Sequence, residues 1–224
     1  MVKSGKNLKK AQVQANLKLV EKKEVLTKPY NDIDLNNWKN YSHVLTNTLW
    51  EFESREKSNG HSYDYHGNYI PQIANQLFER FTKKNDIVLD LFFGSGTSGI
   101  EALNMQRRCI GVELKEDLSN CKSTEEFYDL FEKVAKNGYD CLEKDRFAAL
   151  IIGDKYANGE LVPLGFECMA RMNKLGFRTK SIIVKNIEGN EKCKGKNANL
   201  WRYRALYGGF YIFKHEYIII FQKK

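Results

Sequence analysis

A buried strand followed by a glycine turn is the feature that most constrains this 224-residue chain. The run Ile87-Val-Leu-Asp-Leu is rich in apolar and β-branched residues, which is typical of a strand covered on both faces. Gly94 and Gly96 follow and allow a sharp turn, because glycine carries no Cβ. Thr97 is placed to cap a helix over residues 98–104, whose first amides would face the turn. The sequence therefore predicts an α/β unit that binds a nucleoside-containing ligand.

A second strand leads to an acidic residue after this helix. Residues 109–112 read Cys-Ile-Gly-Val, and Glu113 follows them. An acid at this place, roughly 20 residues beyond the turn, accepts hydrogen bonds from ribose hydroxyls. Gly94, Gly96 and Gly99 also satisfy the Gly-x-Gly-x-x-Gly spacing of dinucleotide sites, so spacing alone leaves NAD open.

The string Asp90-Leu-Phe-Phe-Gly-Ser-Gly-Thr97 resembles the S-adenosylmethionine (SAM) turn of DNA amino-methyltransferases. These enzymes methylate the exocyclic nitrogen of adenine or cytosine, in a restriction-modification or epigenetic context. The resemblance implies a Rossmann-like class I SAM-dependent methyltransferase fold, α/β in class, with a mostly parallel sheet and a C-terminal antiparallel hairpin strand. It implies SAM as the cofactor and DNA as the substrate. The cofactor-binding residues that it implies are Asp90, Leu91, Phe92, Gly94, Ser95, Gly96, Thr97 and, at the ribose, Glu113.

The segment before the strand matches this family as well. Apolar residues at helical spacing predict an amphipathic helix over 72–81, with Pro71 near its first turn. His66 and Pro71 occupy the positions of a His-x-x-x-x-Pro segment that lines the methionine side of the SAM pocket in the family. The family's usual Pro-Thr-Gln-Lys core is replaced here by Gly-Asn-Tyr-Ile.

The second half of the chain reads as the end of the same fold. Patterning predicts helices over 122–143 and 163–175 and strands over 146–154, 179–184 and 216–222. The resemblance identifies these strands with the fifth strand and the terminal hairpin of the family. Asp154 follows the first of them at its carboxyl end, where such sheets bind ligands, and is a candidate for the base pocket.

The catalytic tetrapeptide of the family is absent from the sequence. In relatives this motif is a polar residue (Asp, Ser, Asn or His), then Pro-Pro, then an aromatic residue. The polar residue and the adjacent carbonyl hold the target amine, and the aromatic ring stacks on the flipped base. The prolines here are Pro29, Pro71 and Pro163, and no two are adjacent. The sequence therefore identifies no catalytic residue and does not distinguish adenine from cytosine as the target.

The segment between Glu113 and Phe147 has room for one crossover helix, whereas the family fold needs two further strands there. One explanation is a chain break near residues 116–118, where a mobile stretch of roughly 40–60 residues is missing. The other is a true deletion, which would make the protein a pseudo-enzyme. We favour the break, because loss of two central strands would expose apolar edges of the sheet.

Composition bounds the remaining predictions. The net charge of +8 and the pI near 9.1 suit a polyanionic partner. Residues 1–29 are predicted to form a lysine-rich arm, which either contacts nucleic acid or a partner subunit or is a solvated tail. Residues 30–224 are predicted to form the methyltransferase domain. The loop over 186–207 interleaves cations with aromatic residues, as phosphate and base contacts require, although a solvated loop is the alternative. The substrate-binding candidates, with Asp154, are Lys194, Lys196, Trp201, Arg202 and Arg204.

Other classes of site are not indicated by the sequence. The five cysteines form no Cys-x-x-Cys pair, which predicts neither a disulfide framework nor a metal site. No apolar run approaches the ~18 residues of a membrane span, so the sequence predicts a reduced, cytoplasmic setting. A homodimer or a partner subunit stays open. An RNA methyltransferase and a catalytically inactive SAM- and DNA-binding subunit are the alternative functions.

Overall fold

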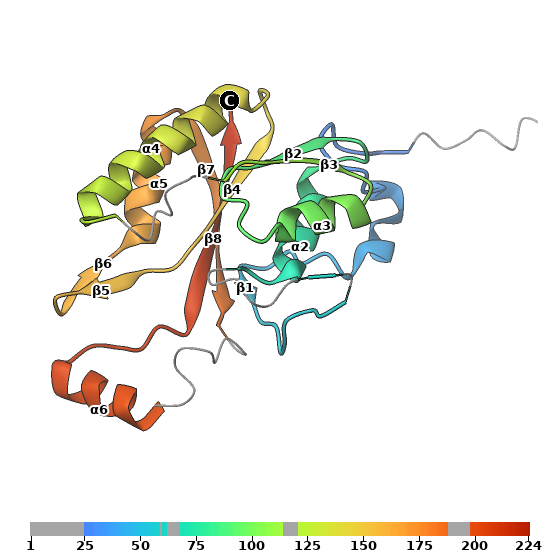
Figure 1. Ribbon diagram of the computed structural model, residues 1–224. Helices are drawn as coiled ribbons and strands as arrows, with labels where there is room; N and C mark the ends of the chain where they lie inside the picture. Colours follow the sequence, from blue (N-terminus) through green and yellow to red (C-terminus); the bar gives the residue numbers. More distant parts are fainter. Residues whose placement is uncertain (1–24, 59, 62–67, 114–120, 188–197) are drawn as a thin grey trace, which may run out of the picture.

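Helices cover both faces of a central four-stranded sheet (Figure 1). The computed structural model describes residues 25–58, 60–61, 68–113, 121–187 and 198–224. The strand order is β1-β7-β8-β4, with bounds Leu49–Trp50, Phe177–Asn186, His215–Lys223 and Phe147–Ile152 respectively. β1 runs parallel to β7, whereas β8 runs antiparallel to both of its neighbours.

Two further strand pairs accompany this sheet. β2 (Ile87–Asp90) and β3 (Arg108–Gly111) are parallel and form a sheet of their own. β5 (Lys155–Ala157) and β6 (Glu160–Val162) form an antiparallel hairpin directly after β4.

The helices divide into two layers and one outlier (Figure 1). α2 (Pro71–Phe81) and α3 (Thr97–Asn104) pack on one side of the molecule, together with the short 3₁₀ helix η1 (Leu35–Tyr41). α4 (Thr124–Cys141) and α5 (Leu164–Lys174) pack on the other side. α6 (Ala198–Gly208) stands apart from both layers.

β8 joins the two hydrophobic cores. Ile218 and Ile220 belong to the core around α2, whereas Ile219 and Phe221 belong to the core around α4 and α5. Successive side chains of a strand point to opposite faces, so one apolar run supplies both cores. Burying each of these side chains contributes roughly 1.5–3 kcal/mol, which makes β8 the structural centre of the protein.

The predicted helices and strands are confirmed within a few residues, but the sheet is not mostly parallel. The fold is α/β with a mixed sheet, because the C-terminal antiparallel strand β8 lies between β7 and β4 rather than at an edge. The helix that follows β2 begins at Thr97, one residue earlier than predicted, and the helix expected over 163–175 ends before Gly176 as α5.

The prediction that the strand before the glycine turn is covered on both faces is wrong. Val88 and Cys109 pack against the α2 core, but Ile87, Leu89 and Ile110 are exposed on the opposite face of the β2–β3 pair. The chain break expected near 116–118 falls within residues 114–120, outside the described part of the chain, and stays a prediction. Most of the arm over 1–29 also lies outside it.

Neither a membrane span nor a metal cluster is present in the described residues. No helix there is long and apolar enough to cross a membrane. No group of three or more His, Cys, Asp or Glu side chains in the same part of the chain is arranged to hold a metal ion.

Candidate functional site

The glycine turn connects the carboxyl end of β2 to the first turn of α3. Gly94 and Gly96 both have positive φ, +49° and +80°, which explains why this turn needs glycine. Gly96 is the N-cap of α3, and no side chain caps the helix. The prediction that Thr97 caps it is wrong, because Thr97 is the first helical residue and its side chain is buried. The first amides of α3 therefore remain as donors toward the turn.

The Asp90 carboxylate holds the turn to the helix. One of its oxygens accepts a hydrogen bond from the Phe92 amide at 3.0 Å, and the other accepts from the Ser98 hydroxyl. Both oxygens thus have partners within the protein. Asp90 shapes the site rather than presenting a free carboxylate to a ligand.

Tyr69 is one of the residues of this site that sequence reasoning missed. Burial, and secondly the negative charge of Asp90, raise the pKa of its phenol well above the usual range. Burial and Asp90 also raise the pKa of the Cys109 thiol. Tyr69 therefore stays neutral beside the turn. Its only sequence signal is its place two residues before Pro71, where the family's usual core is altered.

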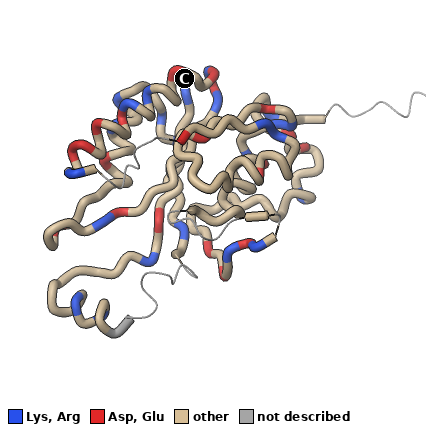
Figure 2. The backbone as a smooth tube through the Cα atoms, viewed as in Figure 1, with Lys and Arg blue, Asp and Glu red and all other residues tan. Residues whose placement is uncertain are grey.

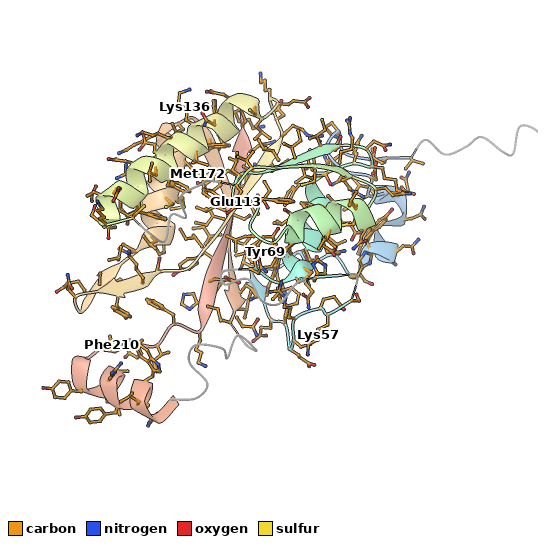
Figure 3. The ribbon with its side chains drawn as sticks, in the orientation of Figure 1. Lys57, Tyr69, Glu113, Lys136, Met172 and Phe210 are labelled. Carbon is orange, nitrogen blue, oxygen red and sulfur yellow. The ribbon has the colours of Figure 1, made fainter. Side chains whose placement is uncertain are left out.

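Glu113 lies at the turn, and its expected contact with ribose hydroxyls stays a prediction. Its carboxylate accepts a hydrogen bond from the Gly94 amide, at 2.6 Å, from a position just beyond β3. In Figure 3, Glu113 and Tyr69 both lie near the middle of the molecule, between the two helical layers. The structure therefore brings the acid of the second strand and the glycine turn into direct contact.

The ring of Phe93 packs among three glycines. A Cβ built on Gly96 would lie 3.2 Å from the ring, one on Gly99 would lie 2.8 Å from it, and one on Gly111 would overlap it. Gly99, the third glycine of the Gly-x-Gly-x-x-Gly spacing, thus has a packing reason that involves no phosphate. Sequence reasoning gave Phe93 no role.

The segment expected at the far wall of the site is described only in part. Pro71 is the first residue of α2 and is fully buried, which confirms its place in the first turn of that helix. His66 lies outside the described residues, and its role stays a prediction.

Asp154 follows β4 and is engaged by the protein. Its carboxylate accepts a hydrogen bond from the Gly165 amide at 2.9 Å, in the first turn of α5. Burial and the nearby Asp154 raise the pKa of the Tyr217 phenol, whose oxygen lies 3.2 Å from Nε2 of His215. A polar chain of three side chains thus marks the carboxyl end of β4.

The remaining substrate candidates divide between α6 and undescribed residues. Trp201, Arg202 and Arg204 lie on α6, where a loop was predicted, and the Arg204 guanidinium lies 5.4 Å from the centre of the Trp201 ring. Lys194 and Lys196 fall outside the described part of the chain. Figure 1 shows α6 away from the glycine turn, so the structure does not bring the substrate candidates on α6 next to the predicted cofactor-binding residues.

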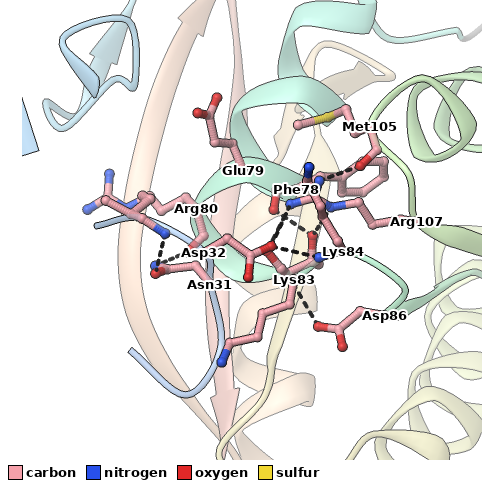
Figure 4. A network of polar contacts seen from close by, with 12 residues as sticks. Asn31, Asp32, Phe78, Glu79, Arg80, Lys83, Lys84, Asp86, Met105 and Arg107 are labelled. Carbon is pink, nitrogen blue, oxygen red and sulfur yellow. Dashed lines mark hydrogen bonds and ion pairs between the residues drawn. The ribbon is translucent and has the colours of Figure 1, made fainter. Parts of the chain in front are cut away.

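A separate hollow of about 640 Å³ lies at the opposite end of α3, where Asn104 and Met105 line it. Figure 4 shows that its polar groups are engaged with one another. The buried Arg107 guanidinium donates to the Thr82 hydroxyl at 3.0 Å, and Asp32 accepts from the Lys84 amide at 2.7 Å. These contacts fasten the segment before η1 to the end of α2. We assign them a structural role.

Comparison with known proteins identifies the family. A family model described as DNA methylase, for the N6 and N4 enzymes, matches residues 1–120, which include the glycine turn and Glu113. The chain belongs to the DNA methylase family.

Individual DNA methylases match shorter stretches. The type II methyltransferase M.MjaII of Methanocaldococcus jannaschii is 31% identical over 93 residues, which are 40% of this chain and 17% of the relative. M.BglI, from Bacillus subtilis, is 35% identical over 83 residues, or 36% and 22% of the two chains. The matches thus span about a fifth of the length of these relatives.

Solved structures from Thermus thermophilus, provisionally named as a DNA modification methylase, are similar over a larger part of the chain. One of them has a TM-score of 0.36 at 16% identity, over 67% of this chain and 50% of that chain. The same protein in complex with SAM gives a TM-score of 0.37 at 15% identity, over the same shares.

Proposed function

We propose that this DNA methylase family member transfers the SAM methyl group to an exocyclic amino group of DNA, either N6 of adenine or N4 of cytosine. The observation that carries the proposal is the contact of Glu113 with the Gly94 amide, at the uncapped N-terminus of α3. It joins an acceptor for ribose hydroxyls to the start of a helix whose first amides no side chain caps, as a nucleoside-containing cofactor requires.

The residues present suit SAM. The amides at the start of α3 form a helix N-terminus, which stabilises a negative charge. This suits the carboxylate at the methionine end of the cofactor. Glu113 would exchange its bond to the Gly94 amide for the ribose hydroxyls. Asp90, with both oxygens engaged, would keep the turn in place. When bound, SAM supplies an electrophilic methyl group on sulfur.

The reaction proposed is a direct transfer. The target base would be flipped out of the duplex, and its amine would attack the methyl carbon in line while the bond from that carbon to sulfur breaks. S-adenosylhomocysteine would leave and the amine would lose a proton to solvent, so no covalent enzyme intermediate is needed. The protein then contributes mainly by holding the two reactants in register and by stabilising positive charge on the amine nitrogen. Tyr69, which stays neutral and half-buried beside Asp90, would exclude water from the turn.

The same proposal gives each part of the chain a structural role. Residues 30–224 would form a Rossmann-like class I methyltransferase domain and residues 1–29 a basic arm, with His66 and Pro71 at the far wall of the SAM pocket. A restriction-modification or epigenetic context follows from the reaction. A cytoplasmic location suits the thiols of Cys109, Cys141 and Cys168, which form no disulfide. A homodimer or a partner subunit is compatible with this assignment.

A catalytically inactive subunit that binds SAM and DNA is the second candidate. The absence of a Pro-Pro pair anywhere in the sequence favours it, because that pair belongs to the family's catalytic tetrapeptide. An RNA methyltransferase shares the same type of SAM turn, but no described residue favours RNA over DNA.

Transfer of labelled methyl groups separates these candidates. The purified chain is incubated with methyl-labelled SAM and either unmethylated DNA or RNA, and the nucleic acid is digested to nucleosides. The proposal predicts label in N6-methyladenine or N4-methylcytosine from DNA, and a Glu113→Ala variant loses it whereas Asp140→Ala, an exposed acid on α4, does not. SAM binding without label in DNA would establish the inactive subunit, and label in RNA alone would establish the RNA enzyme.

A further inference from the structure

α6 and the segment after it expose an unusual set of aromatic side chains. We call residues 200–214 the aromatic arm. Tyr203, Tyr207 and Tyr211 are 64%, 85% and 86% exposed, and Leu206 is exposed as well. An isolated helix of this length is marginal in water, and large exposed apolar groups that cluster mark an interaction surface. The arm therefore presents rings for a partner instead of burying them in the core.

The charge of the arm is of one sign. Arg202, Arg204 and Lys214 lie on it, and the sequence contains no Asp or Glu from residue 192 to residue 215. Figure 2 shows basic residues and no acidic residue on α6. A surface of this charge attracts a polyanion and repels a basic or cationic partner.

The rings on the arm are already arranged in parallel. Tyr203 and Tyr207 lie one helical turn apart, with centroids 6.1 Å apart and ring planes 18° from parallel. Trp201 is covered by the Arg204 guanidinium instead. Two stacked, exposed phenol rings next to arginines are the combination that binds unpaired bases and the backbone between them.

The arm is fastened to the carboxyl end of β4. The ring of Tyr156, on β5, lies 5.1 Å from that of Phe210 and 5.0 Å from that of Phe213, and its hydroxyl accepts from the Tyr211 amide at 3.4 Å. Figure 3 shows Phe210 at the base of α6. β5 directly follows Asp154, so this aromatic cluster joins the arm to the end of the sheet where the family fold binds its ligands.

We propose that the aromatic arm is a DNA-binding element. Arg202, Arg204 and Lys214 contact phosphates, while Tyr203 and Tyr207 stack on bases that are unpaired at the target. The inference rests on the proposed function for the identity of the nucleic acid. It goes further in assigning the contact to a basic, aromatic helix outside the glycine-turn region. A second copy of the chain is the other occupant for exposed tyrosines, but the uniform positive charge of the arm opposes its self-association.

Fluorescence anisotropy with a labelled duplex that carries one central unpaired base tests the arm directly, without SAM. We expect Arg202→Ala/Arg204→Ala to weaken binding at least tenfold and to lower the slope of log K against log salt by about 2, since each phosphate contact contributes about 0.9. Lys133→Ala/Lys136→Ala removes the same charge from exposed positions of α4 and is the matched control.

Tyr203→Ala/Tyr207→Ala is expected to weaken binding roughly tenfold or more, through loss of base stacking. The salt slope should stay the same, and the loss should be smaller on a fully paired duplex. Trp38→Ala, an exposed ring on η1, is the control for loss of aromatic surface. Thermal unfolding of each variant checks that the domain is folded.

The proposal is overturned if the wild type does not bind DNA, if the arginine and lysine pairs weaken binding equally, or if the tyrosine pair has no effect. It is also overturned if the arm variants change the oligomeric state by light scattering and leave DNA affinity intact. Its failure is distinct from that of the proposed function. DNA binding through the arm without methyl transfer would contradict only the function, and methyl transfer that is indifferent to the arm variants would contradict only the arm.

Discussion

The ring of Phe93 occupies the space that a side chain at residue 99 would need. A Cβ built on Gly99 lies 2.8 Å from Cζ of Phe93, although residue 99 is an ordinary helical position of α3. The same ring fills the space next to Gly111 on β3. The distance between α3 and β3 at the candidate site is therefore set by one aromatic ring and by the glycines around it.

Gly99→Ala should destabilise the protein because the new methyl group displaces this ring. In a helix interior, alanine is otherwise favoured over glycine by about 1 kcal/mol, whereas overpacking costs roughly 1–3 kcal/mol. In a Phe93→Ala background the space is open, so the same change should be neutral or stabilising. Urea unfolding of the two single variants and the double variant measures the coupling, and a stabilising Gly99→Ala in the wild type would contradict the assigned contact.

Removal of the Glu113 carboxylate should weaken SAM binding. The proposed ribose contact and the Gly94 amide both depend on its oxygens, and a charged hydrogen bond contributes about 1.5–3 kcal/mol. Calorimetry should therefore show affinity for SAM reduced at least tenfold in Glu113→Ala and less in Glu113→Gln, which keeps one acceptor. An unchanged affinity in the alanine variant would remove Glu113 from the site.

Local patterns in the sequence were sufficient for most elements of this fold. α4 shows why, since Ser123 accepts a hydrogen bond from the Glu126 amide at 3.1 Å and caps a helix whose apolar residues recur at helical spacing. The glycine turn and Glu113 were found in the same way. Both positions follow from strand ends and from conformations that glycine alone adopts readily.

Contacts between distant segments were not predictable from such patterns. An apolar run such as Ile218–Phe221 fits a parallel or an antiparallel strand equally well, so the position of β8 between β7 and β4 did not follow from it. The position of Tyr69 likewise depends on residues far along the chain, such as Asp90 and Cys109. The ring of Phe93 also packs against Gly111, which lies on another strand. α6 was not predicted for another reason. Its apolar residues are largely exposed and form no single apolar face, so the helical spacing that reveals a core-facing helix is missing.

His61 and Glu101 form a buried pair that should contribute strongly to stability. Nε2 of His61 lies 2.9 Å from Oε1 of Glu101, and their side chains are only 1% and 8% exposed. His61→Ala leaves the Glu101 carboxylate with weaker amide partners from Asn75 and Asn104, so unfolding should cost about 3 kcal/mol less. Glu101→Gln in the same background should recover part of that loss.

The exposed pair of His43 and Glu79 is the control for this prediction. Nε2 of His43 lies 2.8 Å from Oε1 of Glu79, but the His43 side chain is 57% exposed. His43→Ala should therefore change the free energy of unfolding by less than about 1 kcal/mol. Equal effects of the two histidine substitutions would show that burial of the His61 pair is not what stabilises the protein.

Ionisation of Cys168 should make the protein less stable in alkaline solution. Cys168 lies on α5 and is fully buried in the core that this helix shares with α4 and β8, and this burial raises the pKa of its thiol from 9.0 to about 12. Below pH 9 the thiol is protonated in both states and contributes no pH dependence. Between about pH 9 and 12 the unfolded chain loses this proton while the folded chain keeps it, so the free energy of unfolding falls as the pH rises. Cys168→Ser removes this titration, and the stability difference from the wild type should change by up to about 1.4 kcal/mol per pH unit in that range. Cys141→Ser, at an exposed position, should leave the pH dependence as it is, and parallel curves for the wild type and Cys168→Ser would contradict the burial of this thiol.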